Sequence, residues 1–292
     1  MSGGVEAPLA AAPQMAPRRE PSRGPFRLLA VDIDGTLVDG TLAITPANLA
    51  ALKGAMASGV RVVLATGRMF RSALPYAEEI GTDEPLIAYQ GAVVRMPDGT
   101  VVKEWEMSRD AARLAVTLSR ELDLHVNLYR DDQFFVEKMS RAARRYADVA
   151  QVEPVLVDDL LTIAEEGSTK VVFVDTPERL RAVAPQVRTA FEPASRVTFS
   201  MPDFLEVVDG HVSKAAALHF ICQRDGVAAH EVIAAGDGPN DRELFEYCGL
   251  AVAPSDASAE VLAAADVQMP PPGQDGIAYL VQTYLAGDGR NL

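Results

Sequence analysis

The sequence is poor in cysteine and histidine, which limits the kinds of site that it can build. Its 292 residues include two cysteines and four histidines. Cys222 and Cys248 lie in apolar surroundings and are too few for a disulfide framework, so we expect both to be small core residues. The histidines lack the spacing of metal ligands, and we interpret them as structural or surface residues.

Basic residues and long apolar runs are also scarce. The chain has 27 lysines and arginines against 41 acidic residues, a formal charge of -14. This excess of acidic residues argues against both nucleic acid and an anionic membrane as a partner. No apolar run approaches the roughly 18 residues of a membrane span, and residues 7–12 are too short for the apolar centre of a signal peptide. We therefore expect a cytoplasmic location.

The chain divides into three parts by composition and hydrophobic pattern. Residues 1–25 are rich in Ala, Pro and Arg without hydrophobic periodicity, which predicts a disordered tail. Residues 26–90 and 203–292 alternate buried strands with helices, which predicts an α/β core with a doubly wound, Rossmann-like parallel sheet. Residues 91–202 alternate half-exposed strands and helices, as an inserted α+β domain does.

Polar residues follow several of the predicted core strands. The strand at 28–31 runs into Asp32, and the strand at 60–65 into Thr66 and Gly67. A third strand is predicted over 85–94, and a fourth ends in the loop "GDGPND", residues 236–241. Ligands bind at the carboxyl edge of open α/β sheets, so we expect a site where these segments meet.

The segment "DIDGT" places Asp32 and Asp34 two residues apart. In an extended chain the two carboxylates would point to the same side, where they would call for a cation. The plain alternative is an exposed Asp-Gly turn. An EF-hand loop is excluded, because that motif requires glycine at its sixth position, which is Leu37 here.

The loop "GDGPND" offers Asp237, Asn240 and Asp241, whose oxygens suit a hard divalent ion such as Mg²⁺. A solvated turn is one alternative. A dinucleotide phosphate loop is another, but Asp241 occupies its third glycine position and would repel a pyrophosphate. Metal binding is the better interpretation.

Two further residues could stabilise a phosphate. Thr66, with the amides that follow it, could bind phosphate oxygens, although a helix cap fits it equally well. Lys214 begins a predicted helix after a strand, and a surface lysine is the alternative. Neither residue alone decides between these interpretations.

The order of the four segments resembles the haloacid dehalogenase-like superfamily. Asp-x-Asp-Gly-Thr, Thr-Gly-Arg, a lysine and Gly-Asp-Gly-x-Asn-Asp follow one another from residue 26 to about 285. More narrowly, the chain is similar to the Cof-type phosphatases, whose cap domain is inserted where residues 91–202 lie. The resemblance implies a hydrolase that acts on phosphate monoesters.

The resemblance also implies roles for the site residues. Asp32 would be the nucleophile that forms an aspartyl-phosphate, and Asp34 the general acid and base. Mg²⁺ would be held by Asp32, the Asp34 backbone carbonyl and Asp237, with Asp241 in support. The transferring phosphoryl group would be stabilised by Thr66, Gly67, Lys214 and Asn240.

The expected substrate is a small phosphorylated metabolite, such as a sugar phosphate. We expect its leaving group to be contacted by Gln90 in the core and by Tyr129, Arg130 and Asp131 in the insert, although an ordinary hairpin bend explains the last three equally well. A phosphomutase of the same superfamily would share every catalytic residue. A non-catalytic binding protein would be expected to lack at least one of them. A response-regulator receiver is excluded because it is far shorter.

Overall fold

The protein is described here by a computed structural model that covers residues 24–285. The predicted disordered tail, residues 1–25, lies outside this range except for its last two residues. No helix within the described range combines the length and the hydropathy that a membrane span requires.

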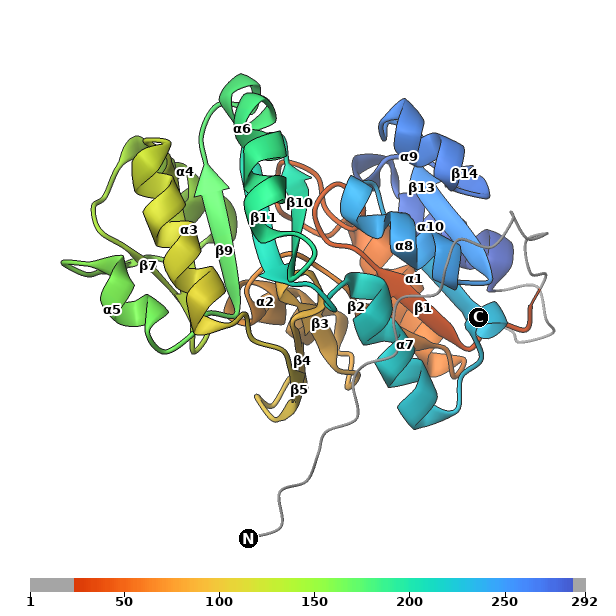
Figure 1. Ribbon diagram of the computed structural model, residues 1–292. Coiled ribbons are helices and arrows are strands. Elements are labelled where there is room, and N and C mark those ends of the chain that lie inside the picture. Colours follow the sequence, from red (N-terminus) through yellow and green to blue (C-terminus); the bar gives the residue numbers. More distant parts are fainter. Residues whose placement is uncertain (1–23, 286–292) are drawn as a thin grey trace, which may run out of the picture.

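A five-stranded sheet forms the centre of the core, with every pairing parallel. The adjacent strands β1 and β12 come from opposite ends of the sequence (Figure 1). All four residues of each are buried, as a sheet covered on both faces requires. The order across the sheet is β14 (Val267–Met269), β13 (Leu250–Pro254), β12 (Val232–Ala235), β1 (Leu28–Val31) and β2 (Arg61–Leu64).

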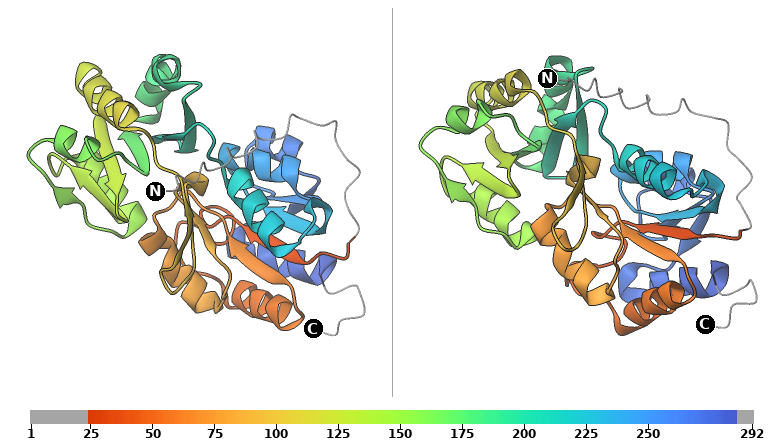
Figure 2. Two further views of the ribbon diagram at one scale, coloured as in Figure 1. Left: turned by 60° about the horizontal axis from the view of Figure 1, so that its bottom comes forward. Right: turned by 90° about the horizontal axis from the view of Figure 1, so that it is seen from below.

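Helices cover both faces of this sheet, as the right-hand view of Figure 2 shows. Alternate residues of β1 point to opposite faces, so Leu29 and Val31 join one apolar cluster and Leu28 and Ala30 join another. The first cluster includes residues of α1 (Pro46–Ala57), α2 (Phe70–Ile80) and α10 (Gly276–Tyr284). The second includes residues of α7 (Lys214–Asp225), α8 (Arg242–Tyr247) and α9 (Ala259–Ala264). The predicted doubly wound core is confirmed.

The inserted domain, called the cap from here on, contains a six-stranded sheet. It is antiparallel except for the pair β7 and β8. In order across the sheet the strands are β10 (Ser195–Met201), β11 (Phe204–Asp209), β9 (Lys170–Val174), β6 (His125–Arg130), β7 (Gln133–Val136) and β8 (Val155–Leu156).

The two faces of the cap sheet have different neighbours. Three helices pack on its outer face: α3 (Arg109–Glu121), α5 (Leu160–Ala164) and α6 (Pro177–Phe191). On the inner face, α4 (Arg141–Ala150) packs within a cluster that continues into the core. In Figure 1 the cap lies to the left of the core. The inner face of the cap is therefore the one that can contribute to a site shared with the core.

The structure corrects the predicted boundary at residue 203. Strand β11 was assigned to the core, but it pairs with β10 on one side and with β9 on the other. Pro202 and Asp203 form the turn of the hairpin between β10 and β11. Because the antiparallel ladder holds β11 in the cap sheet, the chain returns to the core only after Asp209.

The strand predicted over residues 85–94 is also interrupted. Its first part, β3 (Leu86–Ala88), continues the core sheet through a parallel bridge between Ala65 and Ile87. A 3₁₀ turn, η1 (Tyr89–Gly91), follows, in which the φ angles of Tyr89 and Gln90 are +53° and +61°. A strand cannot continue through such angles. The chain then forms a three-stranded antiparallel sheet, in which β3 pairs with β4 (Val93–Arg95) and β4 with β5 (Val101–Glu104).

Candidate active site

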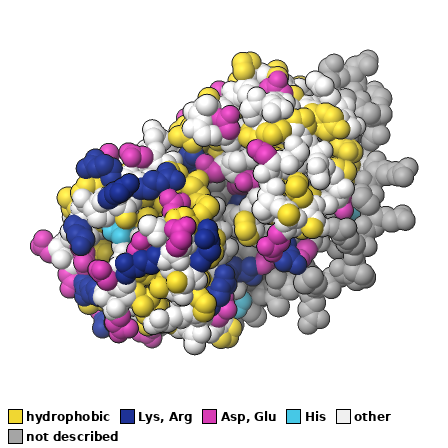
Figure 3. Space-filling model, turned by 90° about the horizontal axis from the view of Figure 1, so that it is seen from above, with side chains coloured by type: hydrophobic (Ala, Val, Ile, Leu, Met, Phe, Trp, Pro, Cys, Tyr) yellow, Lys and Arg dark blue, Asp and Glu magenta, His cyan; other side chains and the backbone are white. Residues whose placement is uncertain are grey.

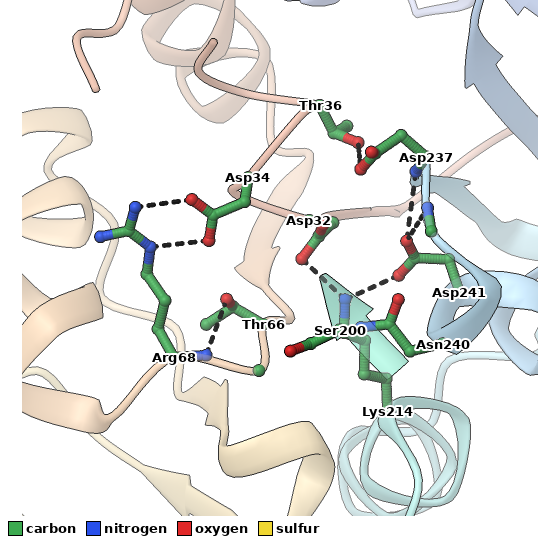
Figure 4. Close-up of polar contacts among 12 residues, drawn as sticks. Asp32, Asp34, Thr36, Thr66, Arg68, Ser200, Lys214, Asp237, Asn240 and Asp241 are labelled. Atoms are coloured by element: carbon green, nitrogen blue, oxygen red, sulfur yellow. Dashed lines mark hydrogen bonds and ion pairs between the residues drawn. The ribbon is translucent and has the colours of Figure 1, made fainter. Parts of the chain in front are cut away.

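Asp32 lies at the carboxyl end of β1 and is almost completely buried, with 5% of its surface exposed. Its Oδ1 accepts a hydrogen bond of 2.7 Å from Nζ of Lys214. The same ammonium group donates to Oδ1 of Asp241, also at 2.7 Å (Figure 4). Lys214 is the first residue of α7, whose N-cap is Ser213. One buried lysine therefore joins segments that lie about 180 residues apart in the sequence.

Three carboxylates gather around this lysine. Oxygen atoms of Asp32, Asp237 and Asp241 lie within 4.8 Å of one another. Asp241 accepts from the backbone N–H groups of Asp237 at 3.1 Å and Gly238 at 3.0 Å, which fixes the loop after β12. Asp237 accepts from the hydroxyl of Thr36 at 3.0 Å. The predicted meeting of these segments at the carboxyl edge of the sheet is observed.

The protonation of the cluster reflects its burial and its crowding. Burial raises the pKa of Asp32 well above its ordinary value; Lys214 opposes this shift, and the neighbouring Asp241 and Asp237 add to it. Burial, and then Asp241, raise the pKa of Asp237 to about 7. Burial would lower the pKa of Lys214, but Asp241 and Asp32 outweigh it and raise that pKa, so the ammonium stays charged.

The cluster fits a divalent cation. Three carboxylates face one ammonium group, and burial together with the neighbouring carboxylates raises the pKa values of Asp32 and Asp237, as expected where positive charge is short. Carboxylate oxygens are the ligands that Mg²⁺ prefers. Gly35, with φ of +80°, lets the chain pass close by, because a Cβ atom there would collide with the carboxylate of Asp237.

Asp34 lies apart from this cluster and pairs with Arg68. The guanidinium donates from Nε to Oδ2 at 2.7 Å and from the terminal Nη2 to Oδ1 at 2.6 Å, a bidentate pair. The chain from Asp32 to Asp34 does not continue the strand as predicted, although both carboxylates line the same cavity. Strand β1 ends at Val31, and the amides of Leu37 and Val38 fold back onto the carbonyl of Ile33. The two carboxylates therefore bind different partners.

Thr66, Gly67 and Arg68 form the loop after β2. The buried hydroxyl of Thr66 accepts from the backbone N–H of Arg68 at 3.1 Å. The carbonyl of Gly67 accepts from Nζ of Lys170, on β9 of the cap, at 2.7 Å. Arg68 was not among the predicted site residues, although it belongs to the Thr-Gly-Arg motif. Its position directly after Thr66 and Gly67 was the signal that could have identified it from the sequence.

Gln90 and Asn240, both predicted site residues, are joined by a hydrogen bond. Asn240 donates to Oε1 of Gln90 at 2.9 Å. Gln90 in turn donates from Nε2 to Glu206 of the cap at 3.0 Å. Gln90 therefore links the loop after β12 to the inner face of the cap sheet.

A small cavity of about 60 Å³ lies between the core and the cap. This volume is well below the ~300 Å³ at which ligand sites begin, so in this structure the cavity is too small for a metabolite. The core lines the cavity with Asp32, Asp34, Thr66, Gly67, Arg68, Asp237, Gly238 and Asn240. The cap lines it with Tyr146, Val149, Ala150, Ser200, Met201, Phe204 and Glu206.

The three predicted cap residues are not among those that line this cavity. Tyr129 is fully buried and its ring packs against those of Phe134 and Tyr146. Arg130 pairs with Glu166, and the side chain of Asp131 is 83% exposed. The hairpin was predicted correctly, but its bend lies away from the cavity. The cap residues that do line it were not identified from the sequence.

The sequence profile of the haloacid dehalogenase-like hydrolases matches residues 29–281. A putative phosphatase of Bacillus subtilis, YxeH, is 31% identical over 269 residues, which cover 88% of this chain and 97% of that protein.

Two solved structures extend this similarity to the fold. TM0651 from Thermotoga maritima is 29% identical, covers 88% of this chain and 97% of its own, and superposes with a TM-score of 0.77. A haloacid dehalogenase-like hydrolase from Bacteroides thetaiotaomicron is 25% identical, with coverages of 88% and 98% and a TM-score of 0.80.

Proposed function

The chain belongs to the haloacid dehalogenase-like hydrolase family, and on this premise we propose that it is a Mg²⁺-dependent phosphatase of a small phosphorylated metabolite. The observation that carries the proposal is the buried contact of Asp32 with Lys214, beside Asp237 and Asp241 and at the wall of a cavity. A carboxylate held in this way can attack an electrophile that enters the cavity. A cytoplasmic location is part of the same proposal.

The first step transfers the phosphoryl group to the protein. An oxygen of Asp32 forms a bond to phosphorus, and the bond between phosphorus and the ester oxygen breaks. The leaving oxygen takes the proton of the Asp34 carboxyl group. Both oxygens of Asp34 accept from Arg68 in this structure, so the transfer requires that at least one of these two hydrogen bonds first be released.

The second step releases phosphate. The Asp34 carboxylate takes a proton from water, and the water oxygen bonds to phosphorus as the bond from phosphorus to Asp32 breaks. Inorganic phosphate and free Asp32 result. Thr66, Gly67, Lys214 and Asn240 would stabilise the charge on the phosphoryl oxygens, a mainly electrostatic contribution.

Mg²⁺ would be held by Asp32, Asp237, Asp241 and the backbone carbonyl of Asp34. When bound, it would neutralise charge on the carboxylate and the phosphate dianion, so that two anions can approach each other. The raised pKa values of Asp32 and Asp237 support this assignment, because burial and crowding leave these groups short of positive charge.

The test is phosphate release from a panel of phosphate esters after treatment with a chelator. We expect release to stop when metal is removed and to return when Mg²⁺ is added. Full turnover in metal-free buffer would contradict the proposal. If isomerised ester forms in place of free phosphate, the protein is a phosphomutase. If the esters bind but no product forms, it is a non-catalytic binding protein.

A further inference from the structure

Two charged residues of the cap point from its sheet toward the core. Along β11, Leu205 and Val207 belong to the outer cluster of the cap, whereas Phe204 and Val208 belong to the inner one. Side chains alternate along a strand, so Glu206 shares the inner face with Phe204 and Val208. On β9, Lys170 shares the inner face with Val172 and Val174 in the same way.

Both residues are buried and paired. Glu206 is 2% exposed and Lys170 is fully buried, and their charged atoms lie 3.1 Å apart. Glu206 also accepts from Gln90 at 3.0 Å and from the hydroxyl of Ser200 at 2.5 Å. Such a pair is costly to bury, so each charge depends on its partners.

The pair presents its negative end to the cavity. Glu206 and Ser200 line the cavity, and Figure 4 shows Ser200 beside the residues of the core. Lys170 does not line the cavity, and its ammonium group donates to the carbonyl of Gly67. The carboxylate of the pair is therefore part of the cavity wall, whereas the ammonium group is not.

Within residues 24–285, the cavity wall has no free cation that could pair with an anionic leaving group. Among the described residues that line the cavity, Arg68 is the only cation, and its Nε and Nη2 atoms both donate to Asp34. The rest of the cap wall is apolar or uncharged: Tyr146, Val149, Ala150, Ser200, Met201 and Phe204. In contrast, Figure 3 shows lysine and arginine side chains on the solvent-exposed surface at the left of the molecule, where the cap lies. Arg141, Arg144 and Arg145 of α4 are exposed to solvent.

We infer that Glu206 makes the site select phosphate esters whose leaving group carries no negative charge. A carboxylate or a second phosphate on the leaving group would be brought beside Glu206 in a water-poor cavity without a cation to pair with. Hydroxyl groups, by contrast, can donate to the carboxylate, and an apolar ring can pack on Tyr146 and Phe204. The inference rests on the proposed phosphatase function and adds the charge of the substrate to it.

The first test uses the full-length protein with Mg²⁺ and two esters that differ in one group. Glycerol 3-phosphate and 3-phosphoglycerate have the same three-carbon skeleton, which ends in a hydroxymethyl group in one and a carboxylate in the other. We expect kcat/KM to be at least about tenfold higher for glycerol 3-phosphate, mainly through KM. Equal or faster hydrolysis of 3-phosphoglycerate would overturn the inference and leave the phosphatase function standing. If phosphate is released neither from these two esters nor from p-nitrophenyl phosphate, both the inference and the proposed phosphatase function are wrong.

The second test assigns the selection to Glu206. The variant Glu206→Gln leaves the charge of Lys170 without its partner, so the ratio of the two kcat/KM values should fall below about threefold through a lower KM for 3-phosphoglycerate. A Glu153→Gln variant removes the same charge from an exposed position of the cap and should leave the ratio unchanged. A loss of activity that is equal for both esters would indicate a structural role and overturn the assignment.

Burial of an unpaired lysine can destabilise the single variant. The double variant Lys170→Met/Glu206→Gln removes both charges and keeps the experiment decisive. We expect it to show a reduced ratio as well, because the wall is then uncharged. A ratio equal to that of the wild-type protein in the double variant would overturn the inference.

Discussion

The core and the cap line the same cavity with different chemistry. Six of the eight lining residues of the core belong to the proposed reaction or its metal, namely Asp32, Asp34, Thr66, Gly67, Asp237 and Asn240. The cap contributes seven, of which Glu206 alone carries a charge. The core therefore has the groups that can break a phosphate ester, and the cap has groups that can only contact the leaving group or exclude water.

This difference follows from the two kinds of sheet. Parallel strands bring their carboxyl ends to one edge, so polar loops from distant segments converge there. The cap instead offers one face of an antiparallel sheet, where alternate side chains point toward the core. A face of this kind can be altered residue by residue without disturbing the edge that carries the chemistry.

The largest expected effect is at Asp32. Asp32→Asn removes the attacking oxygen, so no phosphorylated protein should form and phosphate release should fall below detection. The measurement is a single-turnover reaction followed by mass detection of the phosphorylated chain. Phosphoenzyme at wild-type levels in this variant would transfer the nucleophile to another residue.

Asp34→Asn should have a smaller effect, because Asp32 can still attack. General acid–base assistance is worth roughly 10²–10⁴ in rate, and the loss should lie in that range for esters with poor leaving groups. An activated ester such as p-nitrophenyl phosphate should lose less in the first step and allow phosphoenzyme to accumulate. Equal losses for both kinds of ester would argue against a role in proton transfer.

In the cap, Lys170→Met tests stability rather than chemistry. Removing one partner of a buried pair costs roughly 3–5 kcal/mol, because Glu206 is then left buried without its cation. The free energy of unfolding in urea should fall by about this amount. Lys138→Met, at an exposed position of the same domain, should change it by less than about 0.5 kcal/mol. Similar values for the two variants would contradict the buried pair.

The acid cluster of the core should make Mg²⁺ binding depend on pH. With the pKa of Asp237 at about 7 without metal, protons compete below that pH, and the apparent Mg²⁺ affinity should fall about tenfold per pH unit. A carboxyl pKa raised by folding also means that the metal-free protein loses stability as pH rises toward 7. Thermal unfolding in chelator should therefore give a higher Tm at pH 5.5 than at pH 7.5 if other groups contribute equally, and Asp237→Asn should weaken this trend.

The smallest effect is expected at the hairpin bend of the cap. Asp131→Asn changes a largely exposed side chain that does not line the cavity. We expect kcat/KM for any hydrolysed ester to remain within about twofold of wild type. A fall in kcat/KM for one ester alone would show that the bend contacts the substrate. Substrate contacts would then not be confined to the residues that line the cavity.

The sequence was sufficient where local chemistry decides the structure. The apolar run at 28–31 forms a buried strand. Thr45 followed by Pro46 is a sequence signal for a helix start, and Thr45 caps α1 by accepting from the N–H of Asn48. The sequence also predicted that Asp32 and Asp237 lie close together. Both follow parallel strands of one sheet, and the carboxyl ends of such strands lie at the same edge. These features depend on neighbouring residues and on strand direction, and both can be deduced from the sequence.

Only the tertiary structure decided which polar residues of the cap face the cavity. Glu206 stands in "FLEVVD" and Lys170 in "TKVVFV", and period-two alternation does not say which face of a strand turns toward the core. The partner of Asp34 was hidden for a similar reason, since Arg68 lies 34 residues away and meets it only when β1 and β2 pair. Burial of a charge depends on what packs over it, and that is set by contacts between segments distant in the sequence.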